Sequence, residues 1–112
     1  MIRVRVFRAA SGLWSGFEVA GHAQTAPKGE DLVCSGVSAI VEAIAFGLER
    51  HLDVPTDVRQ ASGELVFRFP VELTSEKELH ASQVLLETLF LSLQALSETY
   101  PGIIEVKEAP EG

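Results

Sequence analysis

The strongest constraint on the fold is the alternation of paired strand patterns with long helical patterns. Residues 2–6 alternate apolar side chains with arginines, which is the period-two pattern of a half-buried strand. Ser11-Gly12 provides a turn into a second predicted strand over residues 13–20. A second hairpin is predicted over residues 54–59 and 65–69.

Two long helices are predicted between and after these hairpins. The first covers residues 32–52, with apolar residues at helical spacing and Asp31 as its expected N-cap. The second opens on the capping-box pair Ser75 and Glu78 and continues to Thr99. Each helix is long enough to cover one face of a small sheet.

A last strand is predicted over residues 103–107, followed by a tail, residues 108–112, that is expected to be loose. The order strand-strand-helix-strand-strand-helix-strand predicts an α+β fold, one mixed sheet covered by two helices. Without a composition break, residues 1–112 are expected to form a single domain. Three apolar residues of the second helix lie off its main stripe, so a homodimer contact, a peptide groove or a wider sheet is expected to cover them: Val84, Leu85 and Leu91.

The charge distribution argues against nucleic acid as a direct partner. The net charge is −7; residues 1–30 carry four basic and two acidic groups, and residues 31–112 carry five and fourteen. Nucleic-acid binding needs clustered Lys and Arg. The acidic surface suits a cationic partner or serves only solubility.

The expected compartment and cofactors follow from the cysteine and histidine content and from the lengths of the apolar segments. A single cysteine excludes an internal disulfide, so a reducing cytoplasm is the expected location. No signal peptide or membrane-spanning segment is expected. One cysteine with scattered histidines has no metal-ligand spacing, so neither a metal nor a cofactor is expected.

Cys34 is the candidate nucleophile because it falls in the predicted first turn of the first helix. Unpaired N–H groups and the positive end of the helix dipole favour a thiolate there. The backbone N–H groups of Cys34 and Ser35 are the expected donors to the oxyanion that forms when a thiolate attacks a carbonyl.

His22 is the candidate partner, since it directly follows the second predicted strand between Gly21 and Ala23. A neutral imidazole can take the thiol proton and return it to a leaving amine. His51 and His80 are poorer partners, because one lies at the far end of the same helix and the other in the second helix. Residues 23–30 form a polar loop that serves either as a lid or as an ordinary connection.

Plain structural interpretations of both residues stay open at this point. A lone helical cysteine is commonly a small buried hydrophobe, and a histidine at a strand end is commonly a turn residue. A redox-sensing thiol would need a reactive Cys34 but not His22.

Three stretches of the sequence resemble a known family. Gly21-His22-Ala23, the run from Gly29 and Asp31 to Cys34-Ser35-Gly36-Val37-Ser38-Ala39, and the later Leu91-Ser92-Leu93-Gln94 are similar to the signature of the ribosomal-processing cysteine protease family Prp. Leu32 and Ser35 stand where isoleucine and alanine are common. The similarity extends over nearly the whole chain.

The resemblance implies a cytoplasmic homodimer with a cysteine-histidine dyad. It implies that Cys34 is the nucleophile and His22 the general base and acid, with Asp31 and Ser38 in supporting roles. It also implies a substrate, the precursor of large-subunit ribosomal protein twenty-seven, which loses its N-terminal extension after a hydrophobic stretch. The alternative from another class is a non-catalytic ribosome-assembly factor that binds a basic ribosomal protein tail.

Overall fold

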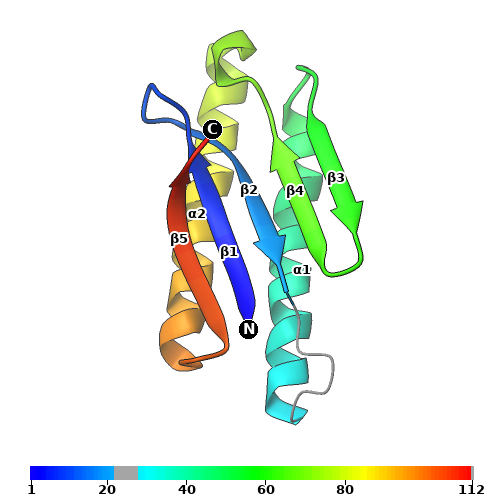
Figure 1. Ribbon diagram of the computed structural model, residues 1–112. Coiled ribbons are helices and arrows are strands. Elements are labelled where there is room, and N and C mark those ends of the chain that lie inside the picture. Colours follow the sequence, from blue (N-terminus) through cyan, green and yellow to red (C-terminus); the bar gives the residue numbers. More distant parts are fainter. Residues whose placement is uncertain (22–27, 112) are drawn as a thin grey trace.

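A five-stranded mixed sheet forms one layer of the molecule, and two helices lie together on one of its faces (Figure 1). The structure is a computed structural model that describes the backbone of residues 1–21 and 28–111 and the side chains of residues 1–21 and 32–111. The strands are β1 (Ile2–Arg8), β2 (Trp14–Ala20), β3 (Asp57–Ala61), β4 (Glu64–Arg68) and β5 (Ile104–Pro110). The helices are α1 (Lys28–His51) and α2 (Glu76–Thr99), with a short 3₁₀ turn, η1 (Val71–Leu73), between β4 and α2.

The sheet order is β3-β4-β2-β1-β5. Only the β1–β5 pair is parallel; the other three neighbouring pairs are antiparallel. The predicted fold class is confirmed, including the mixed sheet and its two covering helices.

The alternation in β1 predicts its two faces correctly. Ile2, Val4 and Val6 are buried under the helices, whereas Arg3 and Arg5 are exposed. The other face of the sheet, which carries Arg3 and Arg5, is not covered by a helix (Figure 1). A half-buried sheet of this kind is what period-two patterning specifies.

The helical layer completes one apolar core with the sheet. The rings of Phe17 and Phe67 stack at a centroid distance of 5.8 Å, and both are fully buried. Leu86, Leu89 and Leu93 of α2 are also fully buried, as their helical spacing requires.

The tail prediction is wrong for the residues that the structure describes. β5 continues to Pro110, in parallel register with β1 as far as Arg8. The Glu111 N–H then donates to the Arg8 carbonyl oxygen at 3.0 Å. Local composition suggested a loose end, but pairing with β1 holds it as strand.

Two further boundaries differ from the predictions. β3 covers Asp57–Ala61 rather than residues 54–59, and Pro55, which has no N–H to donate, lies outside it. α1 begins at Lys28, so it includes residues that were expected to form a loop.

α1 contains a stretch, Leu32–His51, that is long and apolar enough to cross a membrane, with a mean hydropathy of 1.7. In the structure Val37, Val41 and Leu48 of this stretch lie in the core with the sheet. These residues form the buried side of the helix, whereas Leu32 and Phe46 of the same stretch are exposed.

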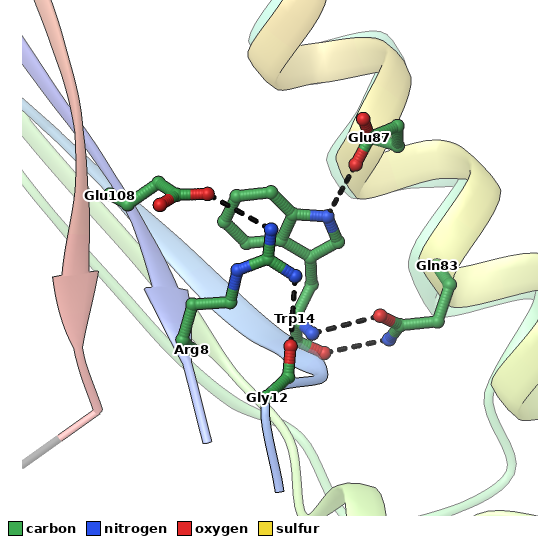
Figure 2. A network of polar contacts seen from close by, with 6 residues as sticks. All are labelled: Arg8, Gly12, Trp14, Gln83, Glu87 and Glu108. Atoms are coloured by element: carbon green, nitrogen blue, oxygen red, sulfur yellow. Dashed lines mark hydrogen bonds and ion pairs between the residues drawn. The ribbon is translucent and has the colours of Figure 1, made fainter. Parts of the chain in front are cut away.

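A polar anchor ties α2 to the start of β2 (Figure 2). The Gln83 side chain accepts from the Trp14 N–H and donates to the Trp14 carbonyl oxygen, both at 2.8 Å. The Trp14 indole N–H donates to the Glu87 carboxylate at 2.7 Å, and the Arg8 guanidinium lies 3.4 Å from the ring centroid. Arg8 is held in turn by Glu108 of β5. These contacts fix the relative position of sheet and helix at one end of β2.

Candidate active site

Cys34 lies on α1 between two buried residues of the core face. Val33 and Val37 are buried, and Cys34 is partly buried and packs against the core beside them. The cysteine is a free thiol. A partly buried thiol at the border between core and surface can be held in one position and still be reached by a ligand.

The start of α1 changes the expected surroundings of this thiol. Because the helix begins at Lys28, Asp31 is its fourth residue and is not the N-cap. The N–H groups of Cys34 and Ser35 therefore lie in the second turn, where helix geometry pairs them with the carbonyl groups of residues 30 and 31. The prediction that these two N–H groups are unpaired first-turn oxyanion donors is wrong for this helix.

Gly21 fixes the point at which the chain leaves β2. Its φ of +87° lies in the left-handed region, and a Cβ atom there would overlap the Met1 carbonyl oxygen. Its N–H donates to the carbonyl oxygen of Gly63, in the β3–β4 turn, at 2.9 Å. The residue before His22 is thus held between β1 and the second hairpin.

His22 itself lies outside the described residues, as do residues 23–27 of the predicted loop. The side chain of Asp31 is also outside the described part, although its backbone is helical. The proposed pairing of His22 with Cys34 therefore stays a prediction.

A groove of about 330 Å³ lies between α1 and the strands at this end of the sheet. One wall is formed by α1 and the other by the end of β2 and the β3–β4 hairpin, which lie alongside the helix (Figure 1). Its lining residues are Val19, Gly21, Ser38, Val41, Glu42, Gln60, Ala61, Gly63, Glu64 and Leu65.

Ser38 connects the groove to the thiol. It is exposed, lines the groove and follows Cys34 by four residues, which is about one helical turn or ~6 Å along the axis. Cys34 therefore lies about one helical turn from Ser38 at one end of the groove, and Gly21, the residue before His22, lines the same groove. An extended peptide in the groove would pass close to the thiol.

The sequence did not indicate the hairpin wall of this groove. The Ser62-Gly63 turn was recognisable as a turn, but its neighbour in space, Gly21, is 42 positions away in the chain. Only the pairing of β2 with β4 brings the two together.

The other histidines are not near the thiol. His51 is the last residue of α1, and His80 lies on α2 beside Trp14 and Gln83, at the opposite end of β2. A wider and shallower depression between Arg8–Ala10 and the end of β5 contains no nucleophilic side chain. Within the described part of the chain, no group of three or more His, Cys, Asp or Glu residues is arranged to hold a metal ion.

Comparisons with known proteins identify the family. Residues 1–105 match the family described as cysteine protease Prp. The ribosomal processing cysteine protease Prp of Bacillus subtilis (strain 168) is 33% identical over 112 residues, which cover 95% of this chain and 96% of that protein.

Solved structures show the same fold. The ribosomal processing protease Prp from S. aureus, in complex with a substrate peptide, has a TM-score of 0.79 at 22% identity, over 97% of this chain and 100% of that chain. The same protein with a covalently linked product peptide gives a TM-score of 0.78 at 23% identity, with the same coverage. SMU.848 from Streptococcus mutans gives 0.75 at 24% identity, over 99% of each chain. The match over nearly the full length, together with the curated relative, shows that this chain belongs to the Prp family of cysteine proteases.

Proposed function

We propose that this protein is the endopeptidase that removes the N-terminal extension of large-subunit ribosomal protein twenty-seven. The observation that carries the proposal is the groove that ends next to Cys34, in a chain that belongs to the Prp family. The relative from B. subtilis is named a ribosomal processing protease, which supports a ribosomal protein precursor as the substrate.

The proposed reaction is acyl transfer through Cys34 and His22. His22 takes the proton of the Cys34 thiol, and the Sγ atom attacks the scissile carbonyl carbon. His22 then gives the proton to the leaving amine nitrogen as the C–N bond breaks, which leaves a thioester on Cys34. Water, deprotonated by His22, attacks the thioester; the C–S bond breaks, the N-terminal extension leaves with a free carboxyl group, and His22 returns the proton to the Cys34 thiolate.

Gly21 and Ser38 are proposed to position the reacting groups. The left-handed φ of Gly21 and its hydrogen bond to Gly63 fix the end of β2, from which the segment of His22 starts. Ser38 is exposed beside Cys34 and can donate a hydrogen bond from its hydroxyl group to a substrate carbonyl. The apolar side of the groove, with Val19, Val41 and Leu65, fits a hydrophobic segment next to the scissile bond.

A homodimer in the cytoplasm is part of the same proposal. Val84 and Leu91 lie two turns apart on α2 and are 52% and 54% exposed, whereas Leu85 packs beside Gly47 of α1. A second copy of the chain would cover this exposed pair. The Leu91→Glu variant should then sediment as a monomer and wild type as a dimer; equal sedimentation of the two would contradict the dimer.

The test is the mass of the substrate after incubation with the enzyme. Wild type should shorten extended ribosomal protein twenty-seven by an N-terminal fragment that ends at an apolar residue, and Cys34→Ser should leave it intact. The His22→Ala variant should process it far more slowly and should also alkylate more slowly at Cys34 near neutral pH. An intact substrate that binds wild type and Cys34→Ser equally well would instead support the non-catalytic assembly factor.

A further inference from the structure

The groove beside Cys34 carries negative charge on both walls. Glu42 projects from α1, and Glu64 comes from the start of β4. Among the described residues, no Lys, Arg or His lines the groove, and neither carboxylate forms an ion pair or a hydrogen bond with a described residue. Two unpaired carboxylates that flank one apolar groove attract a cation there.

The distance along α1 from Cys34 to Glu42 corresponds to a few residues of an extended substrate peptide. Glu42 follows Cys34 by eight positions on α1, which is ~12 Å along the helix axis at ~1.5 Å per residue. An extended peptide advances ~3.3 Å per residue. A peptide that runs along α1 therefore brings its third or fourth residue from the scissile bond to the level of Glu42.

We propose that Glu42 and Glu64 are specificity-determining residues that select a substrate with a Lys or Arg three or four positions from the scissile bond. The inference rests on the proposed endopeptidase activity and adds a charge requirement to it. The apolar lining, with Val41 and Leu65, accepts the aliphatic stem of the basic side chain while the carboxylates contact its charged end. Recognition of this kind combines burial of the stem with neutralisation of the charge.

The experiment compares peptides that differ only in charge at one position. Each peptide carries the same apolar segment before the scissile bond, with either Lys or the uncharged isostere norleucine placed from the second to the sixth position on each side. Wild type should prefer Lys by about threefold to tenfold in kcat/KM at the third or fourth position of one side. The preference should weaken as the salt concentration rises.

Substitutions test whether the two carboxylates cause the preference. In Glu42→Gln and Glu64→Gln the ratio of kcat/KM for the Lys peptide to kcat/KM for the norleucine peptide should fall, and in the double variant it should approach one. Glu49→Gln is the matched control, because Glu49 is exposed on the same helix but does not line the groove; it should keep the full preference.

The outcomes separate the two proposals. If wild type cleaves the norleucine and Lys peptides equally, or if the preference survives in the double variant, the charge selection is refuted and the endopeptidase activity stands. If wild type cleaves no peptide that carries the apolar segment, both proposals fail. Binding of the same peptides to Cys34→Ser, followed by fluorescence anisotropy, should show the same Lys preference without turnover.

Discussion

A single backbone conformation at Gly21 determines how the chain leaves β2. Its left-handed φ and the close approach of the Met1 carbonyl group leave no space for a side chain. The sequence shows Gly21 only as a small neighbour of His22. Its contact with Gly63 depends on strand pairing and could not be predicted locally.

Replacement of Gly21 by alanine should therefore reduce both stability and activity. The left-handed conformation alone costs a non-glycine residue about 1–2 kcal/mol, and overlap with Met1 adds to that cost. Gly102→Ala is a suitable control, because Gly102 has a φ of +85° and no atom within 4 Å of a Cβ position. Gly21→Ala should lose more free energy of unfolding, measured with urea, and more kcat/KM than Gly102→Ala does. Equal losses in the two variants would contradict the positioning role.

Other residue predictions depended on motif rather than on spatial contact. Cys34 was recognised from its place near the start of a helix, and the structure puts it one helical turn from Ser38 of the groove. Glu42 and Glu64 carried no sequence signal, because each is an ordinary surface glutamate until the hairpin and α1 are brought together. Residue chemistry is visible in sequence, whereas convergence of residues from separate elements is not.

At the scale of the element, the beginning of α2 shows what a local signal can determine. The capping box was predicted from Ser75 and Glu78, and both of its hydrogen bonds are present. The Ser75 N–H donates to the Glu78 carboxylate at 3.0 Å, and the Asp53 N–H, just beyond α1, donates to it at 2.7 Å. One side chain thereby caps α2 and ties it to the end of α1.

These contacts predict a pH dependence of stability. The Ser75 N–H, then the Asp53 N–H and the Ser75 hydroxyl group, lower the pKa of Glu78 below its ordinary value of 4.5 by favouring the carboxylate. The stabilisation is fully present above pH 4.5 and is lost as the pH falls through the lowered pKa of the folded state.

The free energy of unfolding measured against pH checks this prediction. Wild type should lose stability as the pH falls below 4.5, and Glu78→Gln should show a shallower loss. Glu98→Gln, on the same helix and without a hydrogen bond from a described residue, should follow wild type. Parallel curves for wild type and Glu78→Gln would show that this carboxylate does not contribute.

Boundaries that depend on distant partners were predicted less well than this cap. A cap residue contributes about 1 kcal/mol, so the signal at Asp31 did not prevent α1 from starting at Lys28. β5 was expected to end at residue 107, but its parallel partner β1 extends it to Pro110. Local patterns identified the elements, and tertiary pairing set their ends.

At the scale of the whole molecule, the two ends of β2 have different tasks. One end leads through Gly21 to the groove, and the other is held to α2 by the anchor of Trp14, Gln83 and Glu87 (Figure 2). A rigid sheet joined to a rigid helix layer would keep the two groove walls at a constant separation. Stability and catalysis are therefore expected to respond to substitutions at different ends.

The Gln83→Ala variant tests whether stability and catalysis depend on different ends of β2. It leaves the Trp14 N–H and carbonyl group without their partner, and an unsatisfied buried polar group costs about 1–3 kcal/mol. Urea unfolding should show that loss, while kcat/KM of the folded enzyme stays at the wild-type value. Gln94→Ala, whose side chain bonds to no described residue, is the control; a fall in kcat/KM specific to Gln83→Ala would show that the two ends are coupled.

The most direct test of the central claim, that Cys34 is the nucleophile of a peptidase, is the mass of the intact enzyme early in turnover. The reaction is started with extended ribosomal protein twenty-seven and stopped in acid, which preserves a thioester. The account predicts an adduct equal in mass to the released extension less one water, located on Cys34, the single cysteine of the chain, and absent from Cys34→Ser. Continued processing of the substrate by Cys34→Ser at the wild-type rate would contradict the account.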